Sequence, residues 1–175
     1  MKRTTLSLSI SSGAILAAVT LFGAASASAE TRLSYGVGVS YCNSDFEACD
    51  EAAVVSLGIE QSLNEANSLE FAYLGGFMFG SGDYHSYALH LKHRLPTQNR
   101  GAWFIAAGPH YYTIEDSVAF AENPSRSGFG MSTKAGWQRY QPQGFGIDAG
   151  VFAKSLPGSD VTMGVAVNFS YAFNL

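Results

Sequence analysis

The last fifteen residues of the chain alternate between apolar side chains and small or polar ones. Every second residue from Val161 to Leu175 is Val, Met, Phe, Tyr or Leu, whereas the residues between them are Thr, Gly, Ala, Asn or Ser. A period of two residues indicates a β-strand with two unlike faces. Shorter stretches of the same alternation occur near residues 33–42, 55–60, 69–73, 86–92, 103–107, 129–138 and 145–151. No segment after residue 30 repeats the apolar period of a helix, so we predict an all-β chain of about eight strands.

The segments between these strands alternate in length and composition. LNEANS, PTQNR and QPQG are typical of short turns, whereas CNSDFEACDE, TIEDSVAFAENPSRS and SLPGSD are mostly longer; a tight GSGD falls among them. Short turns at one end and longer loops at the other are typical of outer-membrane barrels. A soluble sandwich or lipocalin-like barrel also alternates, but its exposed face carries charge, and charged residues make up only 14% of this chain.

A bilayer leaves no backbone amide unpaired, so a spanning sheet has to close on itself. We therefore predict an eight-stranded antiparallel transmembrane β-barrel with an up-and-down meander topology and both ends in the periplasm. Residues 1–29 read as a cleaved signal peptide, with Lys2 and Arg3 before a mostly apolar stretch and Ala27-Ser28-Ala29 at the cleavage site. Residues 30–175 then form one barrel domain. After export, Cys42 and Cys49 are expected to form a disulfide, with two free thiols as the alternative.

The C-terminal segment GVAVNFSYAFNL carries the most specific resemblance. Together with the strand pattern, it resembles the small eight-stranded outer-membrane barrels, the family of outer membrane proteins A and X. In that family the last strand is the signal read by the barrel-assembly machinery, which implies this role for Phe169, Tyr171, Phe173 and Leu175. The signal usually ends in Phe, so Leu175 is a departure. The resemblance also implies an outer-membrane location in a Gram-negative-type cell, with lipid and lipopolysaccharide as partners.

Charged residues on the inward register are the most informative chemistry of the strands. A turn centred near Glu65 sets Glu60 opposite Glu70, and the next hairpin is expected to bring Glu70 opposite Lys92. Two adjacent carboxylates repel unless a cation lies between them, and Lys92, Arg94 or Lys134 can supply it. We expect an interior ion-pair cluster that fills a narrow barrel, with a gated pore as the alternative reading. Its members are Glu60, Glu70, Lys92, Lys134 and Asp148.

An enzyme that modifies lipid A acyl groups is a weaker alternative. Ser86 and His110 share the inward register, and a turn near Gln98 is expected to set them opposite each other as nucleophile and base. The plainer reading is that Ser86 lines the interior and His110 lies at the rim. The His-x-Ser pair of the lipid A deacylases does not occur in this chain. We expect no catalytic residue, no metal and no cofactor.

The expected function is therefore non-catalytic: envelope integrity, or surface interaction through the extracellular loops. The first loop carries Asp45, Glu47, Asp50 and Glu51, and the third carries Glu115, Asp116, Glu122 and Arg126. Such loops suit divalent cations or an unknown surface ligand, and a merely solvated, repelling rim is the alternative. A net charge of −4 gives no reason to expect nucleic acid as a partner.

Overall fold

The computed structural model describes residues 30–43, 51–78, 82–97, 101–116, 125–141, 144–156 and 161–174. None of these residues belongs to a helix with the length and apolarity needed to cross a membrane. The proposed signal peptide, Cys49 and Leu175 lie outside the described residues. The strands are β1 (Glu30–Asn43), β2 (Glu51–Ser62), β3 (Asn67–Met78), β4 (Gly82–Pro96), β5 (Gly101–Asp116), β6 (Ser125–Tyr140), β7 (Phe145–Ser155) and β8 (Val161–Asn174).

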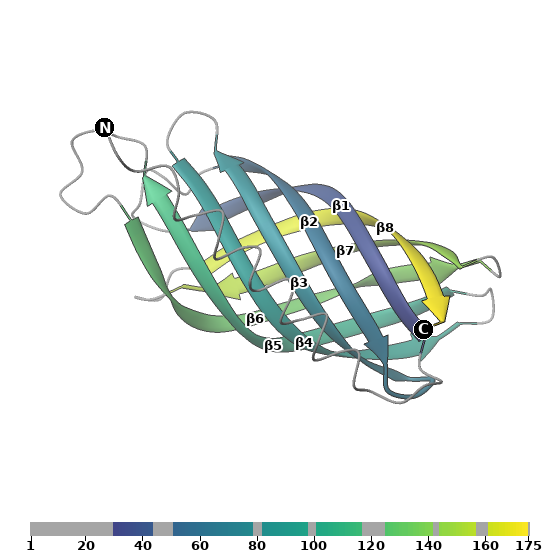
Figure 1. Cartoon of the computed structure of the whole chain (residues 1–175). Coiled ribbons are helices and arrows are strands. Elements are labelled where there is room, and N and C mark those ends of the chain that lie inside the picture. The colour runs from purple at the N-terminus through teal and green to yellow at the C-terminus, as the bar shows by residue number, and fades with distance from the viewer. Residues whose placement is uncertain are drawn as a thin grey trace.

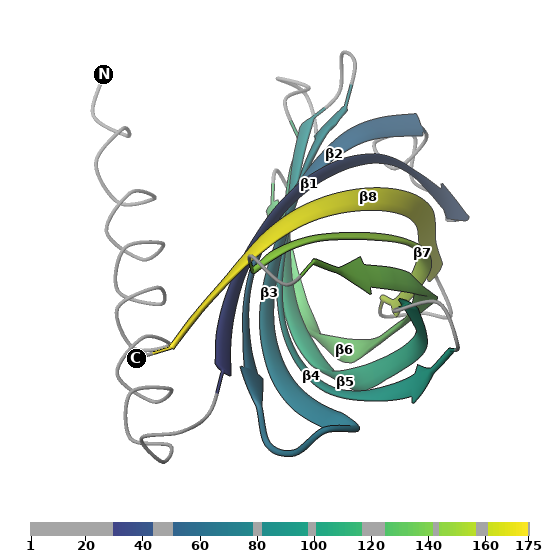
Figure 2. The same ribbon diagram turned by 90° about the vertical axis from the view of Figure 1, so that its right-hand side faces the viewer.

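The eight strands form one closed barrel in which each strand pairs with its neighbour in the sequence (Figures 1 and 2). All pairings are antiparallel, and β1 closes the sheet against β8 from Glu30 opposite Asn174 to Asn43 opposite Val161. Closure leaves no sheet edge with unpaired backbone groups. The predicted eight-stranded meander barrel is therefore confirmed.

Large apolar side chains cover the outside of the barrel. Tyr35, Trp103 and Phe129 are 63%, 58% and 80% exposed, while the residues next to them along each strand are buried or half-buried. Exposed aromatic and aliphatic side chains over the whole outer wall are unfavourable in water but favourable in the hydrocarbon of a bilayer. The alternation that the sequence shows therefore places the apolar register outside.

The barrel has two ends that differ in the segments joining its strands. We call the end formed by Ser62, Asn67, Pro96, Gly101, Tyr140 and Phe145 the turn end, where β1 also starts and β8 stops. We call the opposite end, at Asn43, Glu51, Met78, Gly82, Asp116, Ser125, Ser155 and Val161, the loop end.

Two predicted pairings differ from the structure by two residues. Glu60 lies opposite Glu70 as expected, but Glu70 faces His90 instead of Lys92. Likewise, Ser86 faces Tyr112 instead of His110. The β3–β4 and β4–β5 pairings are symmetric about residues 80 and 99, each one position from the expected centre. Moving a turn centre by one residue shifts the partner by two, which preserves the face on which every side chain lies.

Candidate functional site: the barrel lumen

At the turn end, two arginines and a tyrosine close the lumen. The Arg32 guanidinium lies 3.5 Å from the centre of the Tyr140 ring, and that of Arg94 lies 5.9 Å from it. Arg32 also donates a hydrogen bond of 3.1 Å to the carbonyl oxygen of Gly144. Gly144 has φ 87°, a left-handed conformation that glycine adopts at no steric cost. Arg32 thus ties the start of β1 to the β6–β7 turn.

Above this closure, Glu60 holds two cations. Lys92 Nζ donates to Glu60 Oε2 at 2.9 Å, Ser68 Oγ donates to Oε1 at 2.7 Å, and Arg94 forms a further ion pair with the same carboxylate. Lys92 is only 2% exposed, so its charge depends on this partner rather than on water. Glu60 is therefore the shared partner of two cations near the turn end.

Glu70, directly opposite Glu60, has a cation of its own. Lys134 Nζ forms an ion pair with Glu70 Oε1, and His90 Nδ1 lies 3.7 Å from Oε2. The buried Phe104 ring lies beneath both lysines, 4.5 Å from Lys92 Nζ and 5.7 Å from Lys134 Nζ. Cations near an aromatic face gain electrostatic stabilisation. Each of the two adjacent carboxylates is thus paired separately.

Asp148 belongs to the same lumen but not to an ion pair among the described residues. It accepts a hydrogen bond of 2.7 Å from Asn168 Nδ2, and Asn168 in turn is bonded through Oδ1 to Ser56. Asp148 therefore lies in the predicted cluster by position, while its direct partner is an amide rather than a cation.

Nearer the loop end, Ser86 and His110 come together despite the shifted pairing. Ser86 Oγ lies 3.1 Å from His110 Nδ1. The contact runs diagonally between β4 and β5, since the backbone of Ser86 pairs with Tyr112. His110 Nε2 lies 2.9 Å from the carbonyl oxygen of Ser155, which can only accept, so Nε2 carries the proton. Lys154 Nζ then donates to Ser86 Oγ at 2.7 Å. His110 is 2% exposed and does not lie at a solvated rim.

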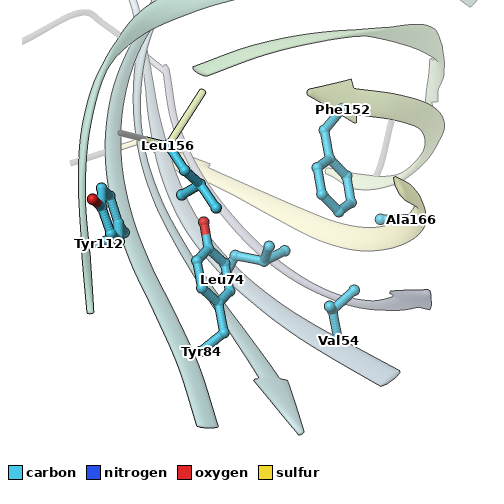
Figure 3. Packing of buried hydrophobic residues seen from close by; sticks show 7 residues of the cluster. All are labelled: Val54, Leu74, Tyr84, Tyr112, Phe152, Leu156 and Ala166. Carbon is cyan, nitrogen blue, oxygen red and sulfur yellow. The ribbon is translucent and has the colours of Figure 1, made fainter. Parts of the chain in front are cut away.

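An apolar layer occupies the lumen beside this polar group. Its side chains point inward from six strands and from the residue after β7, as Figure 3 shows. We call the set the apolar layer: Val54, Leu74, Tyr84, Tyr112, Phe152, Leu156 and Ala166. The apolar layer therefore fills part of the loop half of the lumen with hydrophobic side chains.

Sequence reasoning did not assign the apolar layer to the lumen, and it also missed Arg32, Tyr140, Lys154 and Phe104. Arg32, Tyr140 and Lys154 extend the inward registers of β1, β6 and β7 beyond the stretches whose alternation is clear. Phe104 lies on the inward face of β5, where an aromatic ring interrupts the small-residue pattern. Extending the inward register of β1, β6 and β7 to the end of each strand would have identified Arg32, Tyr140 and Lys154.

The terminal strand and the cysteines complete the predicted sites. Phe169 and Tyr171 lie on the outer wall, where their rings contact Tyr35 and Phe145 at centroid distances of 5.8 and 5.0 Å. Phe173 pairs with Thr31 across the closing seam. The backbone of Cys42 pairs with Thr162 in the same seam, whereas the predicted disulfide partner lies outside the described residues. Among the described residues, no group of His, Cys, Asp or Glu is arranged to hold a metal ion.

The geometry defines a closed meander barrel with an apolar wall and a filled lumen, and solved structures of this kind exist. The crystal structure of Ail, the attachment invasion locus protein of Yersinia pestis, matches 83% of this chain and 99% of its own with a TM-score of 0.63 and 18% identity. Neisserial surface protein A covers 83% of this chain and 97% of its own, with a TM-score of 0.63 and 8% identity.

A third match is the N-terminal β-barrel domain of Pseudomonas aeruginosa OprF, with a TM-score of 0.58 at 14% identity over 80% of this chain and 97% of that domain. At these identities the matches establish the fold, which is that of the small eight-stranded outer-membrane barrels. The sequence matches no protein-family model and no curated protein.

Proposed function

We propose that this protein is a non-catalytic outer-membrane barrel that acts through the surface it presents outside the cell rather than through its lumen. The observation that carries the proposal is the filled interior. The apolar layer blocks the loop half, and the ion pairs of Glu60 and Glu70 with the Arg32–Tyr140–Arg94 contact occupy the turn half. A solute pore needs a continuous polar path, which this arrangement does not provide.

The outer-membrane location rests on the fold and the wall. Barrels are one of only two structures that satisfy all backbone groups in a bilayer, and the exposed apolar register requires lipid. The turn end then faces the periplasm, as expected for a chain exported with its N-terminus on that side. Bilayer lipid and lipopolysaccharide are the proposed surroundings, and the barrel-assembly machinery is the proposed partner during insertion.

The charge distribution supports a role at the outer surface. Segments 43–51, 79–83, 115–126 and 157–160 at the loop end hold nine of the 14 acidic residues and one basic residue, Arg126. The acidic residues are Asp45, Glu47, Asp50, Glu51, Asp83, Glu115, Asp116, Glu122 and Asp160. Such a field attracts cationic partners and repels polyanions. One structure of the similar barrel Ail holds a heparin analogue, sucrose octasulfate; the acidic loop end here suits a partner of opposite charge.

The test compares binding of a basic peptide to cells producing the protein and to cells producing a variant with Asp45, Glu47, Asp50 and Glu51 changed to Asn or Gln. We expect binding to fall several-fold in the variant. Glu65→Gln is the matched control, because it removes an exposed carboxylate at the turn end and leaves the loops intact. Equal binding to both loop forms would contradict the proposed surface role.

The Ser86–His110 contact favours a second candidate, acyl-ester chemistry on lipid A. His110 Nδ1 is free to accept the Ser86 proton, as a general base must. Against this, Ser86 is fully buried, and Lys154 already donates to the oxygen that would attack. A mass spectrum of lipid A from cells with the wild-type protein and with Ser86→Ala decides between the two. An acyl change that depends on Ser86 would replace the non-catalytic reading.

A further inference from the structure

The closed wall of the barrel ends with its shortest strand, β7, while β5 and β6 continue beyond it at the loop end (Figure 1). Backbone pairing between β6 and β7 stops at Ser132 opposite Lys154. Pairing between β5 and β6 continues to Glu115 opposite Ser125. Residues 125–131 of β6 therefore have β5 on one side and, among the described residues, no paired strand on the other. We call this side the free edge of β6.

Contacts at the end of β7 turn the chain away from β6 at this point. Ser155 Oγ accepts a hydrogen bond of 2.8 Å from the backbone N–H of Met131, in the place of a backbone partner. The Ser155 carbonyl instead accepts from His110 Nε2 in the lumen, and Leu156 belongs to the apolar layer. Gly130 permits this turn, because a Cβ there would lie 2.2 Å from the Ser155 carbonyl oxygen. The free edge is thus built into the fold.

The backbone groups of Ser127 and Phe129 face the free edge. Met131 directs its N–H and its C=O towards β7, since both bond to Ser155 Oγ. Backbone direction alternates along a strand, so every second residue before Met131 shares this orientation. The backbone pairings of the described residues give Ser127 and Phe129 no partner on this side. An unpaired row of this kind is a template for another strand.

The free edge begins where the barrel wall is already long enough to cross a bilayer. β7 has 11 residues, Phe145–Ser155. A tilted strand needs about 9–11 residues to cross the hydrocarbon core. Unpaired backbone groups are not tolerated in that core, which agrees with an edge that starts only beyond β7. With the turn end towards the periplasm, the free edge lies outside the cell.

Side chains along the free edge define what a partner strand needs. Phe129 is 80% exposed and the centre of its ring lies 5.1 Å from that of Tyr111, so the outer face is aromatic. On the inner face, Gly128 and Gly130 leave room for the side chains of a neighbour. The surrounding loop-end segments hold nine acidic residues and one basic residue. A matching strand therefore carries apolar side chains on its outer face and basic ones on its inner face.

We propose that the free edge of β6 binds an extended basic segment of a partner protein outside the cell, which adds to the sheet as a further strand in the direction of β7. This inference rests on the proposed surface function and names its partner. Backbone hydrogen bonds to Ser127 and Phe129 hold the segment, and an apolar residue opposite Phe129 extends the row of rings that Tyr111 begins. Basic residues between the apolar ones meet the acidic surroundings.

The test uses a short peptide of alternating Val and Lys, with Phe in place of the central Val, and two N-methylated forms of it. When the Phe lies opposite Phe129, the Val and Phe N–H groups face β6, whereas the Lys N–H groups face away. Methylation of the Val and Phe nitrogens should weaken binding about tenfold or more, and methylation of the Lys nitrogens should leave it unchanged. Fluorescence anisotropy with the barrel in lipid nanodiscs measures both. The two forms carry the same charge, so charge attraction does not separate them.

Ser127→Pro tests the same edge from the side of the barrel. Proline removes the N–H that faces the partner and is tolerated at a strand edge, so binding of the unmodified peptide should fall several-fold. Ser127→Ala is the matched control, because it keeps the N–H and should bind as the wild type does. The electrophoretic shift between unheated and heated protein shows whether each variant is folded.

The outcomes separate the edge from the surface charge. Equal binding of the two methylated forms would overturn the free edge as the site, and the proposed surface function would stand if binding still needed the loop carboxylates. No binding of the unmodified peptide would overturn both. A barrel dimer that forms without peptide and that Ser127→Pro abolishes would assign the edge to a second copy and overturn the proposed partner.

Discussion

The lumenal pair of Glu70 and Lys134 offers the sharpest test of how the interior is held together. The two side chains are 7% and 18% exposed, and Glu70 lies directly opposite Glu60. Removing Lys134 leaves Glu70 with His90 as its remaining ion-pair partner, directly opposite Glu60, which already engages Lys92 and Arg94. Breaking one partner of a buried pair typically costs about 3–5 kcal/mol, and partial exposure of Lys134 places the expected loss near the lower end, about 3 kcal/mol.

We therefore expect Lys134→Met to lower the urea midpoint by roughly 1.5 M, given a slope of about 2 kcal/mol per molar. Glu70→Met should cost about 2–3 kcal/mol, because Lys134 retains some access to water. The double variant removes both charges together and should cost at least about 1 kcal/mol less than the two single losses combined. The assay follows the folded fraction by the electrophoretic shift between unheated and heated protein.

Glu65→Gln is the matched control, since Glu65 is exposed in the turn between β2 and β3. Its free energy of unfolding should lie within about 0.5 kcal/mol of that of the wild type. Strict additivity of the Glu70 and Lys134 losses, or a Lys134→Met midpoint equal to that of the control, would refute the ion-pair account of the lumen.

Three further predictions concern the wall, the terminus and the cysteines. Gly108→Ala should impair folding, because a Cβ there meets the Leu89 carbonyl oxygen at 1.9 Å, whereas Gly76→Ala should be tolerated, since its nearest contact is 3.5 Å; folded yields compare the two. Deletion of Phe173 to Leu175 should sharply reduce outer-membrane levels of the protein, and normal levels would remove the proposed assembly signal. Thiol labelling of the folded, unreduced protein should be negative at Cys42 and Cys49, and ready labelling would exclude their disulfide.

The sequence predicts the barrel and its two faces because alternation is a local property. The face on which a residue such as Trp103 lies is set by the residues two positions before and after it, whatever the turn geometry. The partner across the sheet is different, since it depends on where each turn is centred. The expected pairing of Glu60 with Glu70 across the short β2–β3 turn is correct. The β3–β4 turn is centred one residue away from the expected position, so the partner of Glu70 is His90 instead of Lys92.

Side-chain contacts across the lumen are harder still to predict from the alternation of residues along the chain. Lys154 reaches Ser86 from β7 to β4, 68 residues apart, so the strand order alone does not bring them together. Barrel tilt and side-chain length decide this contact. The Ser86–His110 contact forms even though the expected pairing was wrong, because a histidine ring spans the diagonal between neighbouring strands.

The central claim, a barrel closed at both ends of its lumen, is tested most directly by single-channel recording in planar lipid bilayers. The account predicts no conductance steps for the wild-type protein. Replacing Phe152 and Leu156 by Gly, and Arg32 and Tyr140 by Ser, removes side chains from both closures and should produce measurable current. Regular conductance steps from the wild-type barrel would contradict the account and make the polar residues of the lumen the lining of a pore.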